Sequence, residues 1–263
     1  MKIAVSGKGG VGKTLFAGVL THFLAKEGFK VLAIDADPTP NLALTLGIPL
    51  EEAQKIVPIS ENTQLIESKT QTGFTGVYHL SFSVDDIIDK FSVKSPFGVN
   101  LLVMGTVRSA GAGCMCPANA VVRALLRHLL VRRDEAVVMD LEAGIEHMGR
   151  GTAKHVETML TVTDSSLKSL ETARKLHNLA KEAGIKKAFI VANKVTNSTE
   201  RDLIEKFTAS KGIQLLGFVP YDEQIFKADM KGESPLKHAE TSRGIASIHE
   251  IGETLLGHER SDK

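Results

Sequence analysis

Short apolar runs alternate along the chain with longer segments of helical periodicity. Residues 2–6 form an apolar run, and apolar side chains then recur every three or four positions from Leu15 to Leu24. Continuous apolar runs are typical of strands buried on both faces of a parallel sheet, whereas the longer spacing is typical of a helix. The same pattern predicts further strands at 30–35, 101–104, 135–140, 159–163, 187–192 and 214–219.

Helix patterns fill the segments between these strands. Asn41 begins a short helical segment that ends at Leu46, and Pro117, a residue suited to a first helical turn, precedes an apolar stripe that reaches Leu130. Further helices are expected at 170–183 and 245–256. Strands alternating with helices predict an α/β fold: a doubly wound, mainly parallel sheet with helices on both faces. With 263 residues and 43% hydrophobic content, we expect one domain over 1–263.

Residues 48–100 interrupt this alternation. They contain Pro49, Pro58, Pro96 and a polar run at 60–72, and only the segment around 85–90 predicts a helix. A structureless loop of this length is unusual in a compact domain. We therefore expect a packed elaboration between the core strands, which could contact a partner.

A glycine-rich loop joins the first strand to the first helix. It consists of Gly7, Lys8, Gly9, Gly10, Val11, Gly12, Lys13 and Thr14. The pattern Gly, four free positions, Gly, Lys and Ser/Thr is that of a phosphate-binding loop, whose backbone N–H groups point at the phosphates. Lys13 would reach the β/γ oxygens as a catalytic cation, and the Thr14 hydroxyl would ligate Mg²⁺. A purely structural turn is the alternative, but the strand–loop–helix context favours a nucleoside-triphosphate site.

Lys8 occupies a position where an ordinary phosphate loop needs no lysine. The loop resembles the deviant phosphate loop of the MinD/ParA/nitrogenase-iron-protein superfamily. This resemblance implies a homodimer in which Lys8 contacts the partner subunit's nucleotide, a cation in trans that can raise the rate on the order of 10³-fold. A solvated surface lysine is the alternative. Leu15 belongs to the nucleotide-binding set, but many relatives carry a second hydroxyl at this place beside Thr14.

Acidic residues end two of the predicted strands, at the edge where open α/β sheets bind ligands. The resemblance implies that Asp37 lies in a first switch, prepares the attacking water and senses Mg²⁺, while Asp35 shapes the turn. Both could instead be helix-capping aspartates. Asp140 ends a Walker-B-like strand and is expected to hold Mg²⁺, through water. Asp140, Glu142 and Gly144 form the predicted second switch, because a Gly144 N–H can swing toward the γ-phosphate.

The nucleotide base is predicted to lie against Asn193 and Lys194. An asparagine side chain can pair bidentately with adenine N6 and N7. Guanine-binding versions of this motif carry Asp two places after the lysine, whereas this chain has Thr196. The sequence therefore favours ATP over GTP. The segment that begins with Pro220 and Tyr221 resembles the base-flanking loop of the superfamily.

Cys114 and Cys116 are the only cysteines in the chain. Cysteines are often buried small hydrophobic residues, but the glycines at 111 and 113 favour exposure. The pair lies at or just before a predicted helix N-terminus, where partial positive charge favours the thiolate. Two thiolates do not complete a four-coordinate Zn²⁺ or Ni²⁺ site, so a two-fold partner would bring the other two.

The Cys-x-Cys segment at 111–117 and the Glu-Ala-Gly-Ile-Glu-His run at 142–147 resemble CooC/AcsF-type nickel-insertion ATPases. These proteins serve the maturation of carbon monoxide dehydrogenase and acetyl-CoA synthase, and the resemblance covers nearly the whole chain. It implies an ATP-dependent metallochaperone that uses ATP/ADP, Mg²⁺ and Ni²⁺ (or Zn²⁺) and serves an apo form of one of these enzymes as client. His147 is either a second-shell ligand or an ordinary helix-start residue.

Composition limits the alternatives. With 32 basic and 31 acidic residues, no basic run and a charge-balanced segment at 257–263, neither nucleic acid nor a membrane is an expected partner. The absence of a signal-peptide pattern and the two cysteines favour the cytoplasm. An iron–sulfur cluster carrier or nitrogenase-iron-protein-like ATPase is the alternative function, because four shared thiolates can also hold a [4Fe–4S] cluster.

Overall fold

In the computed structural model, the residues described are 1–263 without 73–77, 80–81, 106–116, 133–134, 143–149 and 262–263. Their strands form one eight-stranded sheet in the order β3-β4-β2-β5-β1-β6-β7-β8. β3 pairs antiparallel with β4, and the other neighbours are parallel. The strands are β1 (Lys2–Gly7), β2 (Val31–Asp35), β3 (Val93–Lys94), β4 (Asn100–Val103), β5 (Ala136–Asp140), β6 (Thr158–Thr163), β7 (Lys187–Val195) and β8 (Leu215–Pro220). The predicted α/β fold with a mainly parallel sheet is confirmed.

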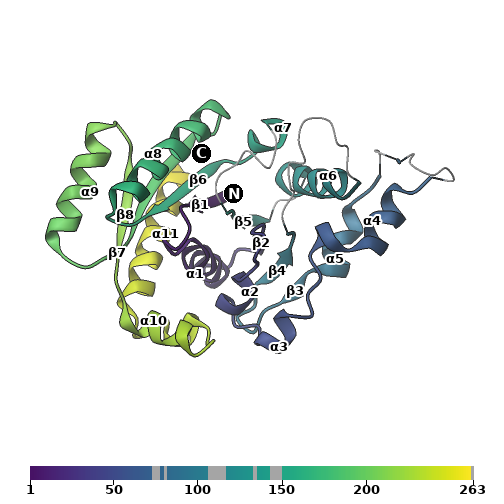
Figure 1. Ribbon diagram of the computed structural model, residues 1–263, viewed down its shortest axis with the longest axis horizontal. Helices are drawn as coiled ribbons and strands as arrows, with labels where there is room; N and C mark the ends of the chain where they lie inside the picture. The colour runs from purple at the N-terminus through teal and green to yellow at the C-terminus, as the bar shows by residue number, and fades with distance from the viewer. Residues whose placement is uncertain (73–77, 80–81, 106–116, 133–134, 143–149, 262–263) are drawn as a thin grey trace.

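Helices cover both faces of this sheet (Figure 1). They are α1 (Lys13–Lys26), α2 (Leu42–Thr45), α3 (Leu50–Ala53), α4 (Thr63–Thr70), α5 (Asp85–Phe91), α6 (Pro117–Arg132), α7 (Arg150–Ala153), α8 (Leu167–Glu182), α9 (Ser198–Ser210), α10 (Glu223–Met230) and α11 (Arg243–Ser261). Short 3-10 turns occur at Ile59–Glu61 and Pro235–His238.

Each face of the sheet packs against helices in its own apolar cluster, so the core has two layers. In β1, Ile3 and Val5 pack with α1, α2 and α11, while Ala4 between them packs with α6 and α8. This alternation follows from the period of two along a strand. Because both layers are apolar, strands covered on both faces are continuous hydrophobic runs, which explains why the sequence pattern located every strand except β3, whose two residues are not buried.

Within the 48–100 region, α4 and α5 pack on α6. Leu65 of α4 and Ile87 of α5 share one buried cluster with Val121 and Leu125 of α6. An ion pair from His128 Nε2 to Asp85 Oδ1, at 3.2 Å, adds a polar contact between α6 and α5. The helix expected near 85–90 is thus α5, whereas α4 was not expected from its polar sequence.

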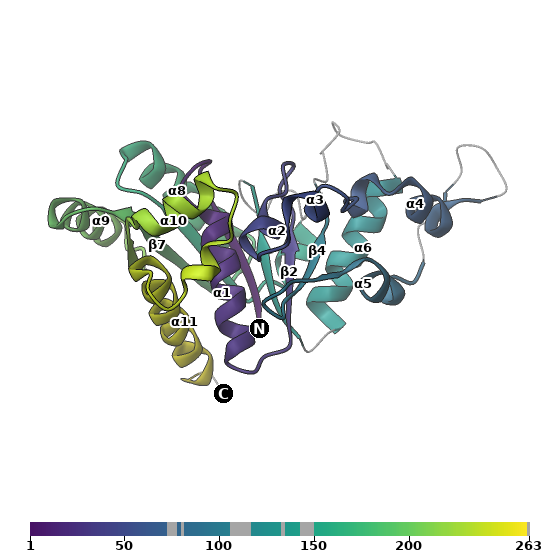
Figure 2. The same cartoon turned by 90° about the horizontal axis from the view of Figure 1, so that it is seen from below.

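The strand order brings three sequence-distant segments to one edge of the sheet. β2 and β1 flank β5, so Asp35 lies opposite Asp140 in register and the loop after β1 lies beside both. In Figure 2, α2 and α10 lie on either side of the same end of α1. Both therefore border the phosphate-binding loop.

None of the described helices combines the length and apolar character needed to cross a membrane.

Candidate functional site

The glycine-rich loop is shaped by close backbone approaches. It runs from the end of β1 at Gly7 to Lys13, the first residue of α1. Gly12 has φ 92°, and a Cβ atom there would overlap Asn193 Nδ2; a Cβ atom on Gly7 would overlap the carbonyl oxygen of Val162. Only glycine fits these two positions. The loop therefore delivers Lys13 and the α1 N-terminus, with its partial positive charge, to the sheet edge.

The end of β7 holds this loop from the other side. Asn193 Nδ2 donates a hydrogen bond of 2.7 Å to the carbonyl oxygen of Val11, and Lys194 Nζ donates one of 2.8 Å to that of Gly10. Lys194 has φ 59°, in the left-handed region. Asn193 is buried but retains a second N–H and a carbonyl oxygen for a ligand. The residues predicted to bind the base therefore also brace the phosphate-binding loop.

Asp140 provides the electrostatic centre of the site. It is fully buried at the end of β5, and neither carboxylate oxygen has a hydrogen-bond partner among the described residues. Burial raises the pKa of Asp140 to about 7; Thr14 lowers it, the nearby Asp35 raises it and Lys13 lowers it. A buried carboxylate without partners, with Thr14 beside it, suits a hydrated Mg²⁺, because the ion and its water would stabilise the charged form.

Asp35 has a different role from Asp140. Its Oδ2 accepts a hydrogen bond of 2.9 Å from the N–H of Leu42, the first residue of α2, and its Oδ1 accepts one of 3.1 Å from the N–H of Asp37. Burial raises the pKa of Asp35 to about 6, although these hydrogen bonds lower it. Asp37 in turn accepts hydrogen bonds from the N–H and the hydroxyl of Thr39. Asp35 thus shapes the turn and starts α2, as expected from the sequence.

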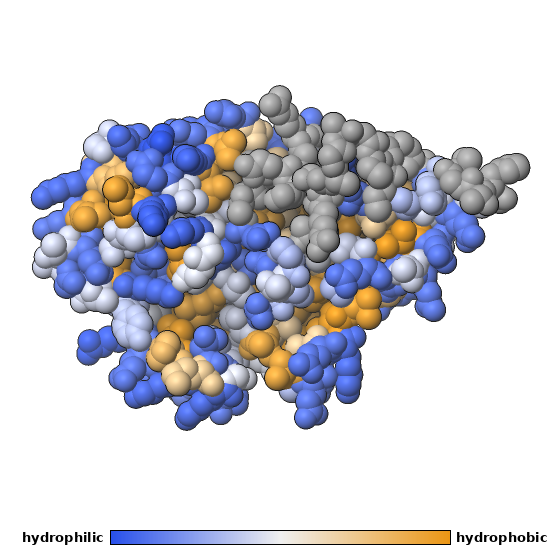
Figure 3. All heavy atoms as spheres, viewed as in Figure 1, coloured by the Kyte–Doolittle hydropathy of each residue, from blue (hydrophilic) through white to orange (hydrophobic). Residues whose placement is uncertain are grey.

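A cavity of about 550 Å³ opens between the phosphate-binding loop, α2 and α10. Figure 3 shows a hollow with apolar residues between the α2 and α10 sides of the molecule. Predicted nucleotide-binding residues line this cavity: Gly10, Gly12, Lys13, Thr14, Leu15, Asn193, Lys194, Pro220 and Tyr221. A volume of several hundred Å³ is typical of a small-molecule site.

Other predicted site residues lie outside that lining. Lys8 is exposed at the outer lip of the loop and does not border the cavity of its own chain. Asp37 is half-buried and Glu142 is exposed, and neither lines the cavity. Cys114, Cys116, Gly144 and His147 lie outside the described residues. Within the described part of the chain, no group of three or more His, Cys, Asp or Glu side chains is arranged to hold a metal.

The α10 wall of the cavity was missed by the sequence analysis. Ile225 and Phe226 supply apolar surface, and Asp229 and Glu233 place carboxylates where they can accept hydrogen bonds from sugar hydroxyls. The segment carries no glycine or lysine motif, so only the presence of an amphipathic helix at 223–230 could have indicated it.

Asp222 fixes this wall to the rest of the fold. It caps α10 by accepting a hydrogen bond of 2.8 Å from the N–H of Gln224, and it also accepts bonds from the hydroxyl of Ser242 (2.7 Å) and the N–H of Gly244 (3.0 Å). Burial alone would raise the pKa of Asp222, but these hydrogen bonds lower it below its usual value. The wall that follows Pro220 is therefore anchored to the start of α11.

Comparison with known proteins agrees with this geometry. Residues 2–236 match the family model described as the CobQ/CobB/MinD/ParA nucleotide binding domain. The chain is 44% identical over 251 residues to an uncharacterized ATP-binding protein of Methanocaldococcus jannaschii, covering 94% of this chain and 96% of the relative. It is also 44% identical over 236 residues to the carbon monoxide dehydrogenase accessory protein CooC of Rhodospirillum rubrum, covering 89% of each.

Among solved structures, the MinC:MinD cell division complex of Aquifex aeolicus contains a similar chain. The TM-score is 0.71 with 20% sequence identity, and the match covers 98% of this chain and 96% of the other. At this identity the likeness concerns the fold.

Proposed function

Because this chain belongs to the CobQ/CobB/MinD/ParA family of nucleotide-binding domains and is an ATPase, we propose that it drives nickel insertion into carbon monoxide dehydrogenase or acetyl-CoA synthase. The observation that carries the proposal is the 44% identity with CooC over 89% of both chains. The match spans 236 residues, so the two chains share more than a short motif.

The ATPase centre is assigned to the residues around the cavity. Lys13 neutralises phosphoryl charge, and Thr14 and Asp140 would hold Mg²⁺, which supplies charge stabilisation when bound. Asp37 positions the attacking water. The exposure of Lys8 and its place outside its own cavity support a role in trans, in which it reaches the nucleotide of a second copy. The working unit is therefore a homodimer.

The nickel cargo is assigned to Cys114 and Cys116. Two copies of the pair would supply four thiolates across the dimer axis, a donor set that suits Ni²⁺ or Zn²⁺. When the dimer opens after hydrolysis, each half keeps only two thiolates and the ion is released to the apo-enzyme.

The connectivity of the chain supports coupling between the two sites. α6 begins at Pro117, directly after Cys116, and the chain then enters β5, which ends at Asp140. A nucleotide-dependent change around Asp140 and the predicted switch residues Glu142 and Gly144 would therefore act on the strand that follows α6.

Anaerobic equilibrium dialysis with Ni²⁺, with and without a non-hydrolysable ATP analogue, tests the proposal. We expect one ion per two chains with nucleotide, and loss of that ion in Cys114→Ser and in Cys116→Ser. Thr254→Ser, at an exposed position of α11, is a control that should leave metal binding unchanged. Lys8→Ala should retain nucleotide binding but fail to dimerise, as measured by light scattering.

Two results would contradict the proposal. One tightly held ion per chain in both cysteine variants would eliminate the shared thiolate site. A brown, anaerobically purified protein with iron and sulfide would favour the [4Fe–4S] alternative.

A further inference from the structure

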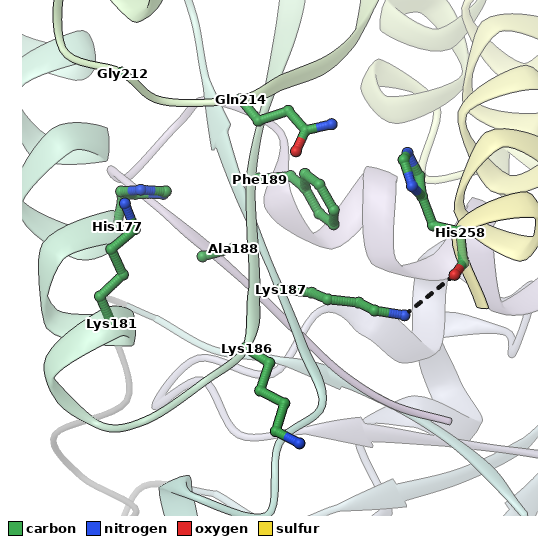
Figure 4. Close-up of a pocket in the computed structure, with 9 residues that line it drawn as sticks. All are labelled: His177, Lys181, Lys186, Lys187, Ala188, Phe189, Gly212, Gln214 and His258. Carbon is green, nitrogen blue, oxygen red and sulfur yellow. Dashed lines mark hydrogen bonds between the residues drawn. The ribbon is translucent and has the colours of Figure 1, made fainter. Parts of the chain in front are cut away.

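A second cavity, of about 370 Å³, lies at the opposite end of β7 from the nucleotide site (Figure 4). It exists because β7 begins at Lys187, whereas β8 begins only at Leu215, opposite Ile190. The first residues of β7 therefore have no strand beside them on that edge, and α8 and α11 close the space from the two faces of the sheet. The cavity is lined by His177, Lys181, Lys186, Lys187, Ala188, Phe189, Gly212, Gln214 and His258.

The charges around this cavity have one sign. Lys181 and Lys186 are exposed at its rim, and Lys187 is oriented by a hydrogen bond of 3.4 Å from its Nζ to the carbonyl oxygen of His258. In Figure 4, His177 and Lys181 lie on one side of β7, and Lys187 and His258 lie on the other. Figure 4 shows the Lys181 side chain reaching toward the His177 ring, whereas Lys186 and Lys187 point away from that ring. Among the described residues, the lining of the cavity includes no aspartate and no glutamate.

His177 gives a second and independent indication of a ligand. Its side chain is 3% exposed and borders the cavity, yet neither ring nitrogen has a hydrogen-bond partner in the described part of the chain. Burial, and then the charge of Lys181, lower the pKa of His177, so the ring is neutral and carries one N–H donor. Buried polar groups without partners are rare in folded proteins and are costly.

We propose that this cavity binds a compact anion that carries phosphoryl groups, held by Lys181 and the His177 ring, with Lys186 and Lys187 adding positive charge around the cavity. A phosphoryl group carries close to two negative charges at pH 7 in a small volume. Lysine binds phosphate as a point charge, so a group of lysines suits a compact, multiply charged phosphoryl anion. The cavity is smaller than the nucleotide cavity, which favours an anion without a nucleoside.

Calorimetric titration with pyrophosphate tests this proposal. The protein is first saturated with ADP and Mg²⁺, so that the phosphate-binding loop is occupied. We expect one further pyrophosphate per chain, with affinity reduced about tenfold or more in the double variant Lys181→Ala/Lys186→Ala. The control Lys168→Ala/Lys175→Ala removes two exposed α8 lysines outside the lining and should change the affinity less than twofold.

Two further measurements complete the test. The NMR signals of the His177 ring should shift on titration in the wild type and remain unchanged in the Lys181→Ala/Lys186→Ala variant. Citrate at equal concentration should bind at least tenfold more weakly than pyrophosphate. No binding to the ADP-saturated protein, equal losses in the two double variants, or equal affinity for citrate would overturn the proposal. ATP hydrolysis plays no part in this test, so its outcome is independent of the proposed nickel function.

Discussion

Replacing Asp140 with asparagine should stabilise the nucleotide-free protein while abolishing its activity. Burial raises the pKa of this carboxyl from 3.8 to about 7. A rise of roughly three units corresponds to about 4 kcal/mol of destabilisation of the folded state above pH 7, because each unit is about 1.36 kcal/mol. An asparagine amide left without partners costs about 1–3 kcal/mol. Above pH 7, the free energy of unfolding of Asp140→Asn should therefore exceed that of the wild type by about 1–3 kcal/mol.

The difference in folding stability between Asp140→Asn and the wild type depends on pH. The unfolded chain ionises near pH 4 and the folded chain near pH 7, so the wild type loses stability as the pH rises between these values. Near pH 4, Asp140→Asn should therefore be less stable than the wild type by the cost of its unpartnered amide, about 1–3 kcal/mol. It should become the more stable protein as the pH rises toward 7, and the difference should then remain constant. Calorimetry in EDTA should show a melting temperature at pH 8 that is higher by about 2–5 °C.

Asp35→Asn is the matched control. Asp35 is also buried and its pKa is also raised, to about 6, but both its oxygens accept backbone hydrogen bonds, from Leu42 and Asp37. An amide group can accept only one of them, which costs about 1–3 kcal/mol. Removing the raised pKa returns about 3 kcal/mol above pH 6, so this variant should be less stable than the wild type near pH 4 and should gain less than Asp140→Asn at pH 8. Both variants should lose Mg²⁺-dependent hydrolysis, on the order of 10²-fold or more for Asp140→Asn. A melting temperature of Asp140→Asn at or below that of the wild type at pH 8 would refute this reasoning.

Three other variants test the contacts around the phosphate-binding loop. Gly12→Ala should lower ATP affinity by at least tenfold in a fluorescent-nucleotide assay, since its Cβ would overlap Asn193 Nδ2; unchanged affinity would contradict the observed packing. Residue 194 has φ 59°, in the left-handed region that glycine adopts more readily than alanine, so Lys194→Gly should be about 1 kcal/mol more stable than Lys194→Ala in urea unfolding. Both variants lose the hydrogen bond to the carbonyl oxygen of Gly10 and should bind ATP equally weakly. Thr196→Asp should raise GTP hydrolysis relative to ATP hydrolysis in a phosphate-release assay, and an unchanged ratio would argue against a base site at this segment.

The sequence predicted the core of the fold because the physical signal there is local. Each central strand is buried on both faces and is therefore an apolar run, and each covering helix has an apolar stripe. α9 was not predicted because only Ile204 and Thr208 of its residues are buried. Its start is marked by Asn197, whose side chain accepts a hydrogen bond from the N–H of Glu200.

The candidate site was predictable only where a motif is contiguous. Gly7 to Thr14 supplies the loop, but the hydrogen bond from Asn193 to Val11 joins residues that are 182 positions apart. Asp229 and Glu233 reach the cavity only because α10 is capped by Asp222 and anchored near Gly244. Hydrophobic periodicity reports only on neighbouring residues, so contacts between residues this far apart in the sequence could not be predicted from it.

Tyr221 in the wall of the nucleotide cavity gives the molecule a built-in optical probe. The chain has no tryptophan and only two tyrosines, and the other one, Tyr78, is not among the residues that line the cavity. Ultraviolet emission excited near 280 nm therefore comes from two phenols alone, and a Tyr78→Phe variant would leave a single emitter. Occupancy of the site could then be followed in real time, without attaching a dye.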